Sequence, residues 1–117
     1  MNIEEVREYA LTMPGVTEDM PYGPDWLIFR IGGKIFLHLR LESPEPTCAV
    51  KLNPDEGADL REHYDGIRPA YHLNKMHWND LYLDTLDDAL VKLLIGKSYR
   101  IVRARLPKRL RSQYGEG

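Results

Sequence analysis

The fold is decided by residues 26–41, which run Trp26-Leu27-Ile28-Phe29-Arg30-Ile31-Gly32-Gly33-Lys34-Ile35-Phe36-Leu37-His38-Leu39-Arg40-Leu41. Two runs rich in β-forming residues flank a two-residue Gly-Gly link. Because glycine takes positive φ at both turn positions without steric cost, this link is a strong β-hairpin signal. Simple alternation predicts an apolar face and a more polar, solvated face for the second strand. The apolar face would carry Ile35, Leu37, Leu39 and Leu41, and the polar face Phe36, His38 and Arg40.

Helices are predicted on both sides of this hairpin. Asn2 is a good N-cap for a helix over about residues 2–12, which Pro14 and Gly15 end. Residues 14–25 contain three prolines and two glycines, so they are expected to form a loop. The remaining expected elements are a strand at 47–52, a helix from Pro54 to about Tyr64, a strand at 78–84, a helix from about 85 to Arg103 and one further turn at 108–111, with a possible short strand in 66–75.

The length and composition fit one globular domain. The chain has 117 residues, of which 43% are hydrophobic and 29% charged. The element order α-β-β-β-α-(β)-β-α predicts an α+β fold in which helices pack on a mostly antiparallel sheet. We expect the domain to cover residues 1–112 and residues 113–117 to form a disordered tail.

The sequence also favours a cytoplasmic protein without a membrane partner. Cys48 is the sole cysteine, so no internal disulfide can form. The first residues are acidic and do not resemble a signal peptide, and no apolar run approaches the roughly 20 residues that span a bilayer.

The histidines and the cysteine do not form a recognisable catalytic or metal-binding motif. His72 and His77 are five residues apart, which matches neither a helical nor a strand ligand pair. His38 is expected to be solvated and His63 exposed on a helix. Cys48 lies in the middle of a predicted strand, where cysteine is commonly a small apolar filler. We therefore expect no metal, no cofactor and no catalytic residue, and hence a protein that is not an enzyme.

The charges are distributed asymmetrically. Residues 97–111 contain seven basic residues and no acidic one, while the other nine basic residues share the rest of the chain with all 18 acidic residues. A basic segment of this kind can contact an anionic partner, although a solvated helix end is the simpler explanation. The candidate nucleic-acid-binding residues are Lys75, Lys97, Arg100, Arg103, Lys108 and Arg109.

Residues 67–79 form a second candidate binding segment, because they combine aromatic, imidazole and amide side chains without a regular period. Binding side chains are often carried by loops on a rigid scaffold. The alternative is structural: the aromatic residues cover the sheet while the polar ones satisfy loop backbone groups. The candidate residues are Tyr71, His72, Asn74, His77 and Trp78.

Several of these motifs resemble the MmcQ/YjbR family of small bacterial proteins, over nearly the whole chain. The most specific is the run Leu73-Asn74-Lys75-Met76-His77-Trp78, supported by Met13-Pro14-Gly15, Gly32-Gly33-Lys34-Ile35-Phe36, Val50-Lys51-Leu52, Arg68-Pro69 and Ser98-Tyr99. Ala70 stands where the family usually has glycine. The resemblance implies a fold akin to secretion chaperones, and a "double-wing" DNA-binding function that is itself a family-level inference. It implies no catalytic residue and no cofactor.

Three functions follow as hypotheses, in descending order. The first is nucleic-acid binding, although the sequence pI of about 6.1 is low for a dedicated binder. The second is a protein- or peptide-binding module, possibly a dimer. The third is a small-molecule enzyme with His72 or His77 as a base, which would need a cleft.

Overall fold

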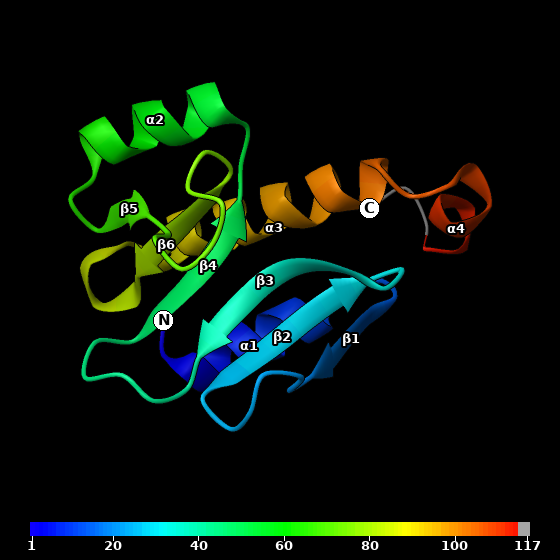
Figure 1. Cartoon of the computed structure of the whole chain (residues 1–117), viewed down its shortest axis with the longest axis horizontal. Helices are drawn as coiled ribbons and strands as arrows, with labels where there is room; N and C mark the ends of the chain where they lie inside the picture. The colour runs from blue at the N-terminus through cyan, green and yellow to red at the C-terminus, as the bar shows by residue number, and fades with distance from the viewer. Residues whose placement is uncertain (115–117) are drawn as a thin grey trace.

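The computed structural model describes residues 1–114, which contain six strands and four α-helices. The strands are β1 (Val16–Asp19), β2 (Trp26–Ile31), β3 (Lys34–Arg40), β4 (Thr47–Lys51), β5 (Ile67–Pro69) and β6 (Trp78–Tyr82). The helices are α1 (Ile3–Leu11), α2 (Pro54–His63), α3 (Asp88–Ala104) and α4 (Lys108–Gln113), with a short 3-10 helix, η1 (Leu83–Thr85), before α3. The strands form one antiparallel sheet in the order β1-β2-β3-β4-β6-β5, which confirms the expected α+β class (Figure 1).

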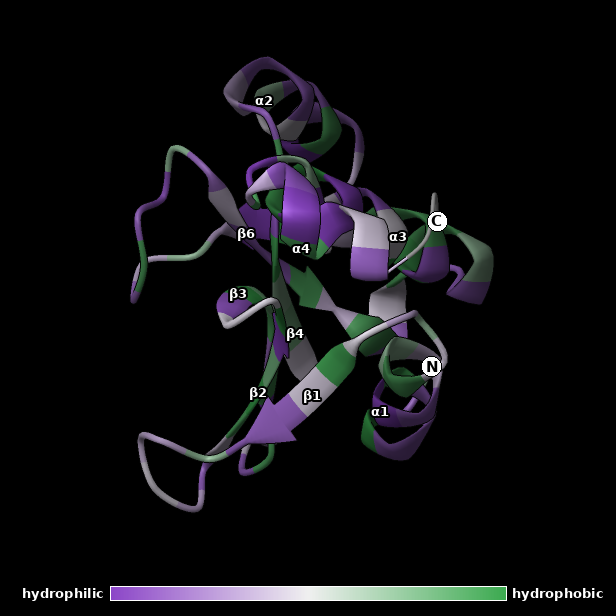
Figure 2. Ribbon diagram, turned by 90° about the vertical axis from the view of Figure 1, so that its right-hand side faces the viewer, coloured by the Kyte–Doolittle hydropathy of each residue, from purple (hydrophilic) through white to green (hydrophobic). Residues whose placement is uncertain are grey.

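The helices cover the sheet unequally. α1 and α3 pack against one face, while α2 contacts the edge strand β5. Figure 2 shows α1 and α3 on one side of the sheet and two loops that reach away from it on the other. We call this second side the open face. Within residues 1–114, no helix is long and apolar enough to cross a lipid bilayer.

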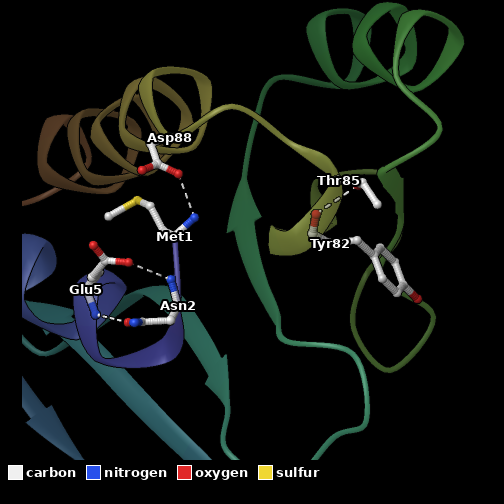
Figure 3. Close-up of polar contacts among 6 residues, drawn as sticks. All are labelled: Met1, Asn2, Glu5, Tyr82, Thr85 and Asp88. Atoms are coloured by element: carbon white, nitrogen blue, oxygen red, sulfur yellow. Dashed lines mark hydrogen bonds and ion pairs between the residues drawn. The ribbon is translucent and has the colours of Figure 1, made fainter.

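The N-terminal ends of α1 and α3 are joined by polar contacts (Figure 3). Asn2 and Glu5 form a capping box, in which each side chain accepts a hydrogen bond from the backbone N–H of the other residue. The amino group of Met1 lies 2.6 Å from the Asp88 carboxylate in the first turn of α3. These contacts fix where α1 begins and hold it beside α3.

The β2–β3 hairpin has the expected Gly-Gly turn, with φ values of 56° at Gly32 and 82° at Gly33. Its strands do not alternate as simply as predicted. Phe29 pairs with Leu37 but Arg30 pairs with Ile35, so Phe36 is the extra residue of a β-bulge. Phe36 and Leu37 are consequently both buried in the core beneath α1 and α3, and the expectation that Phe36 lies on a solvated face is wrong.

A buried serine holds this bulge. The hydroxyl of Ser98, on α3, donates a 2.5 Å hydrogen bond to the Phe36 carbonyl and accepts a 2.8 Å bond from the Lys51 backbone N–H. Ser98 is fully buried. One side chain thus connects α3 to the bulge of β3 and to the last residue of β4.

The C-terminal segment is held against the hairpin and the loop after α1. Leu106 lies against Gly32, and the ring of Tyr114 lies against Gly15; a Cβ added to either glycine would come within 3 Å of these side chains. Both glycines have positive φ. The hydroxyl of Tyr99 also donates a 2.7 Å hydrogen bond to the Pro14 carbonyl. The position of α4 therefore depends on close approaches that only glycine permits.

Two further expectations need correction. Residues 14–25 are not all loop, because β1 pairs with the outer edge of β2 over residues 16–19. α4 includes Gln113, so the boundary expected at residue 112 falls inside a helix. Residues 115–117, the rest of the expected tail, lie outside the described residues.

We expect Ser98→Ala to lower the free energy of unfolding by about 2–4 kcal/mol, because it leaves a buried carbonyl and a backbone N–H without their partner. Urea denaturation followed by circular dichroism measures the change. Ser112→Ala is the matched control, since its exposed hydroxyl bonds to the Lys108 carbonyl within α4, and it should cost less than about 0.5 kcal/mol. Equal stability of the two variants would contradict the role given to Ser98.

Candidate functional site

The open face carries a pocket of about 240 Å³ between two loops. The loop between β1 and β2 contributes Tyr22, and the loop between β5 and β6 contributes Ala70, His72 and Leu73. Trp26, the first residue of β2, completes the wall. The pocket is thus built from segments about 50 residues apart in the sequence that the sheet brings together.

The floor of the pocket follows from strand register. His38 pairs with Ala49, and Ala49 pairs with Asp80, so the three side chains lie in one row across β3, β4 and β6. Ala49 is small, which leaves room between the imidazole and the carboxylate. The sheet therefore places a polar group on each side of an apolar gap.

His38 is enclosed by aromatic rings. Its ring centroid lies 4.8 Å from that of Trp78 and 6.3 Å from that of Trp26, both in edge-to-face arrangements. Only 6% of the residue is exposed, so the expected solvated position is wrong. Burial, together with the nearby charge of Arg30, lowers the pKa of His38 to about 4. The imidazole is consequently neutral at neutral pH.

Asp80 is the carboxylate of the pocket. Burial raises the pKa of Asp80 to about 6, against the opposing effects of His72 and Arg40. Among residues 1–114 its carboxylate makes no ion pair and receives no hydrogen bond. A half-buried carboxylate without a donor is costly in the free protein. It is available to accept hydrogen bonds from a bound molecule.

The rim of the pocket is unusually apolar for a surface. Met20 and Tyr22 on one loop, and Tyr71 and Met76 on the other, are between 44% and 72% exposed. They are four of the seven large apolar side chains that are exposed within residues 1–114. Exposed apolar groups gathered around a pocket are a common mark of a binding surface.

A second candidate surface surrounds the last turn of α3. One hollow, of about 380 Å³, is lined by Arg103, Lys108, Arg111 and neighbouring small residues. Another, of about 300 Å³, is lined by Lys34, Lys51 and Arg105 with two apolar residues. Figure 1 shows α4 and the β2–β3 turn at this same end of the molecule. We call these six basic side chains the cationic end: Lys34, Lys51, Arg103, Arg105, Lys108 and Arg111.

The cationic end has little local compensation. None of its six side chains forms an ion pair with a carboxylate of residues 1–114. The Nε of Arg103 is buried and has no hydrogen-bond partner in the same part of the chain. Burial and the charge of Arg105 lower the pKa of Lys51. An anion bound here would relieve both conditions.

The predicted nucleic-acid-binding residues do not form one surface. Lys97 is paired with Glu56 of α2, with 2.7 Å between Nζ and Oε2. Lys75 lies on the loop over the open face, 5.6 Å from the ring of Tyr71. Arg103 and Lys108 belong to the cationic end. Arg100 and Arg109 are exposed on α3 and α4, outside the residues that line its two hollows.

The residues predicted in the loop have mixed roles. Asn74 organises the loop: its side chain accepts from the Met76 N–H, and its carbonyl accepts from the N–H groups of His77 and Trp78. Trp78 packs against His38 behind the pocket. His72 lines the pocket, 6.5 Å from Trp26, whereas Tyr71 is at the rim. The structural interpretation therefore holds for Asn74 and Trp78.

The remaining histidines and the cysteine are not part of either surface. His63 is exposed on α2, as expected, where its Nδ1 lies 2.8 Å from the Asp59 carbonyl. Cys48 is buried, and burial raises the pKa of its thiol to about 12, so it is a poor nucleophile. Within residues 1–114, no three histidine, cysteine or acidic side chains are grouped closely enough to hold a metal ion.

Sequence reasoning missed the residues that long-range pairing brings in. Tyr22, Trp26 and Asp80 line the pocket, and Lys34 and Lys51 join the cationic end, but no local motif marks them. The alternation of Trp78, Asp80 and Tyr82 along β6 does indicate that they share a face. The identity of their partners on β4 cannot be obtained from one strand.

We expect Asp80→Asn to change the pH dependence of stability. The pKa of Asp80 is raised to about 6 from 3.8, so between these values the folded chain binds more protons than the unfolded chain. Asp80 therefore makes stability fall as pH rises through that window. Relative to the wild type, the variant should gain about 1–2 kcal/mol in unfolding free energy between pH 3.5 and pH 7, a value reduced for solvent screening.

Urea titrations at several pH values measure this gain. His38 acts in the opposite direction, because its lowered pKa makes stability rise with pH between about 4 and 6.5. The variant should therefore show a steeper rise than the wild type. Asp55→Asn, at an exposed position on α2, is the control and should follow the wild-type profile. Parallel profiles for wild type and Asp80→Asn would rule out a burial penalty at Asp80.

Comparison with known proteins gives a consistent family. The YjbR family model matches residues 11–101. The chain is 35% identical over 107 residues to the Escherichia coli O157:H7 protein named "Uncharacterized protein YbdF", covering 91% of this chain and 88% of that protein. It is 31% identical over 114 residues to "Uncharacterized protein YjbR" of Escherichia coli K12, covering 95% of both.

Solved structures agree with the sequence relatives. The crystal structure of the Deinococcus radiodurans protein DR2400, described with the family-model domain DUF419, superposes with a TM-score of 0.89 at 26% identity, covering 99% of this chain and 93% of that one. A Pseudomonas syringae crystal structure gives a TM-score of 0.77 at 26% identity, with coverages of 87% and 99%. The family model, the relatives and the fold all lead to one conclusion: this chain belongs to the YjbR family.

Proposed function

We propose that this protein binds nucleic acid through the cationic end. The observation that carries the proposal is the pair of hollows beside the last turn of α3, which present six basic side chains without a carboxylate partner among residues 1–114. Phosphate groups are the natural partners of such side chains, and contacts to them do not depend on base sequence. The family resemblance to predicted DNA-binding proteins points the same way.

Helix-end electrostatics explains only part of this charge. Arg103 donates from Nη2 to the Arg111 carbonyl, and Arg111 donates from Nη1 to the Ala104 carbonyl, so both help to close the corner between α3 and α4. Lys34 and Lys108 are exposed and make no such contact within residues 1–114. They come from β3 and α4, and only the fold brings them to one end. These two residues are therefore the sharpest test of the proposal.

The net charge of −2 limits what the proposal can claim. Acidic residues dominate the rest of the chain, so a duplex would be attracted at one end and repelled elsewhere. Binding should be of modest affinity, strongly dependent on salt, and oriented with the cationic end toward the phosphates.

We expect the double variant Lys34→Gln, Lys108→Gln to bind duplex DNA about tenfold more weakly at low salt, because it removes two phosphate contacts. Fluorescence anisotropy with a labelled oligonucleotide measures affinity across a salt series. The slope of log affinity against log salt should become shallower by about 1–2 for the same reason.

The matched control removes two cations from another part of the surface, in Arg7→Gln, Lys92→Gln. Both residues are exposed, and they lie on α1 and in the first half of α3. The control has the same net charge as the test variant, so any effect of total charge appears in both. Equal affinities for the two double variants would remove the cationic end from the proposal, and no binding by the wild type at low salt would end it.

The alternative function, a protein- or peptide-binding module, has a specific observation of its own. The exposed apolar side chains Met20, Tyr22, Tyr71 and Met76 frame the open-face pocket and would suit an apolar partner. We place it second because these four residues are divided between two loops that enclose a pocket rather than forming a flat patch.

A further inference from the structure

We propose that the open-face pocket binds a planar nitrogen heterocycle that presents two adjacent N–H donors, as the 2-amino-6-oxo edge of guanine does. This inference does not rest on the nucleic-acid-binding proposal, because the pocket and the cationic end share no lining residue. It assigns a ligand class to a site built by β2, β3, β4, β6 and the two loops.

The size of the pocket favours a small ligand. Its volume is about 240 Å³, below the range of about 300–1,000 Å³ that is usual for drug-sized molecules. A single base or a similar bicyclic ring is of suitable size. A folded peptide segment is too large to be enclosed there.

The walls favour a flat ligand. Trp26 and Tyr22 provide aromatic side chains on one side, and His72 stands 6.5 Å from Trp26. Stacking of a base on an aromatic side chain contributes about 1–3 kcal/mol without regard to base identity. Ala49 and Ala70 are both buried and have small side chains, so the space between the walls stays open.

The polar groups favour N–H donors. The Asp80 carboxylate lines the pocket and has no donor of its own among residues 1–114. One carboxylate can accept two parallel N–H bonds, which is the pattern that adjacent donors on a ring edge provide. His38 is neutral, so it supplies an uncharged donor or acceptor at the other end of the floor.

An organic cation is a less suitable ligand. The guanidinium of Arg40 lies 5.7 Å from the Trp26 ring, on the same side of the sheet as the pocket. Its charge acts on Asp80, as does that of His72. A cationic ligand would be repelled by Arg40, whereas a neutral ring with N–H donors would not.

The test compares three nucleotides that carry the same phosphate. We expect GMP to bind more tightly than IMP, which lacks the 2-amino group, and more tightly than AMP, which lacks both donors. The indole N–H resonances of Trp26 and Trp78 report binding in a two-dimensional NMR titration, since Trp26 lines the pocket and Trp78 contacts His38. Equal binding of all three nucleotides would show attachment through phosphate and overturn the proposal, as would no binding by the folded chain.

Two variants separate the carboxylate from the wall. Asp80→Asn should lose at least about tenfold in GMP affinity and should lose the preference for GMP over IMP, because an amide cannot accept two N–H bonds. Tyr22→Ser, at an exposed loop position, should weaken all three nucleotides by a similar factor. Asp55→Asn is the control for the carboxylate change and should keep wild-type affinity and preference. A retained preference in Asp80→Asn would refute the assigned role.

The source of the ring is decided by a further comparison. Single-stranded oligonucleotides with a central guanine or a central hypoxanthine test whether the pocket takes a base from a strand, because only that source makes the difference depend on both Asp80 and strand length. A free nucleotide as the ligand instead gives the GMP preference without any preference among strands. The Lys34→Gln, Lys108→Gln variant should keep its GMP preference in either case, so failure of the nucleic-acid-binding proposal remains distinguishable from failure of this one.

Discussion

The hydroxyl of Ser98 is the contact on which the arrangement of both surfaces depends. It bonds to the carbonyl at the bulge of β3 and to the N–H of the last residue of β4, and so fixes α3 against the two central strands. The bulge allows Phe36 to enter the core while His38, two residues later, remains on the open face. Without it, the two side chains would share a face. The same contact sets the height at which α3 ends, and thus where its basic last turn lies relative to Lys34 and Lys51.

The molecule separates two kinds of chemistry. The cationic end is formed by side chains with long, flexible stems around a helix end, which suits a partner with repeated negative charge. The open-face pocket is formed by short or rigid side chains on a sheet, with one carboxylate and one neutral imidazole. The first surface is open and electrostatic, and the second is partly closed and apolar. Two such different surfaces on one small domain are consistent with two ligands or with two parts of one ligand.

Much of the fold could be predicted from local patterns. The Gly-Gly turn, the Asn2 cap and the Asn53-Pro54 start each act within a few residues, and each stands where it was expected. The bulge at Phe36 could not be predicted, because a single strand does not show which partner residue its neighbours face. The pocket was missed for the same reason: His38, Ala49 and Asp80 meet only through the register of three strands. β1 was missed because its glycines and prolines outweighed a four-residue run. The cationic end was partly predicted, since the basic run of α3 is local while Lys34 arrives by folding.

The glycines at positions 15 and 32 have a consequence for how related sequences are compared. Each leaves no room for a side chain, one against the Tyr114 ring and the other against Leu106. A relative with a larger residue at either position must carry its last helix elsewhere, whatever basic residues that helix contains. Counting lysines and arginines in an alignment would then be misleading, because two small residues in the first third of the chain decide whether those charges converge. Family members are better grouped by these two glycines than by the charge of their C-terminal segments.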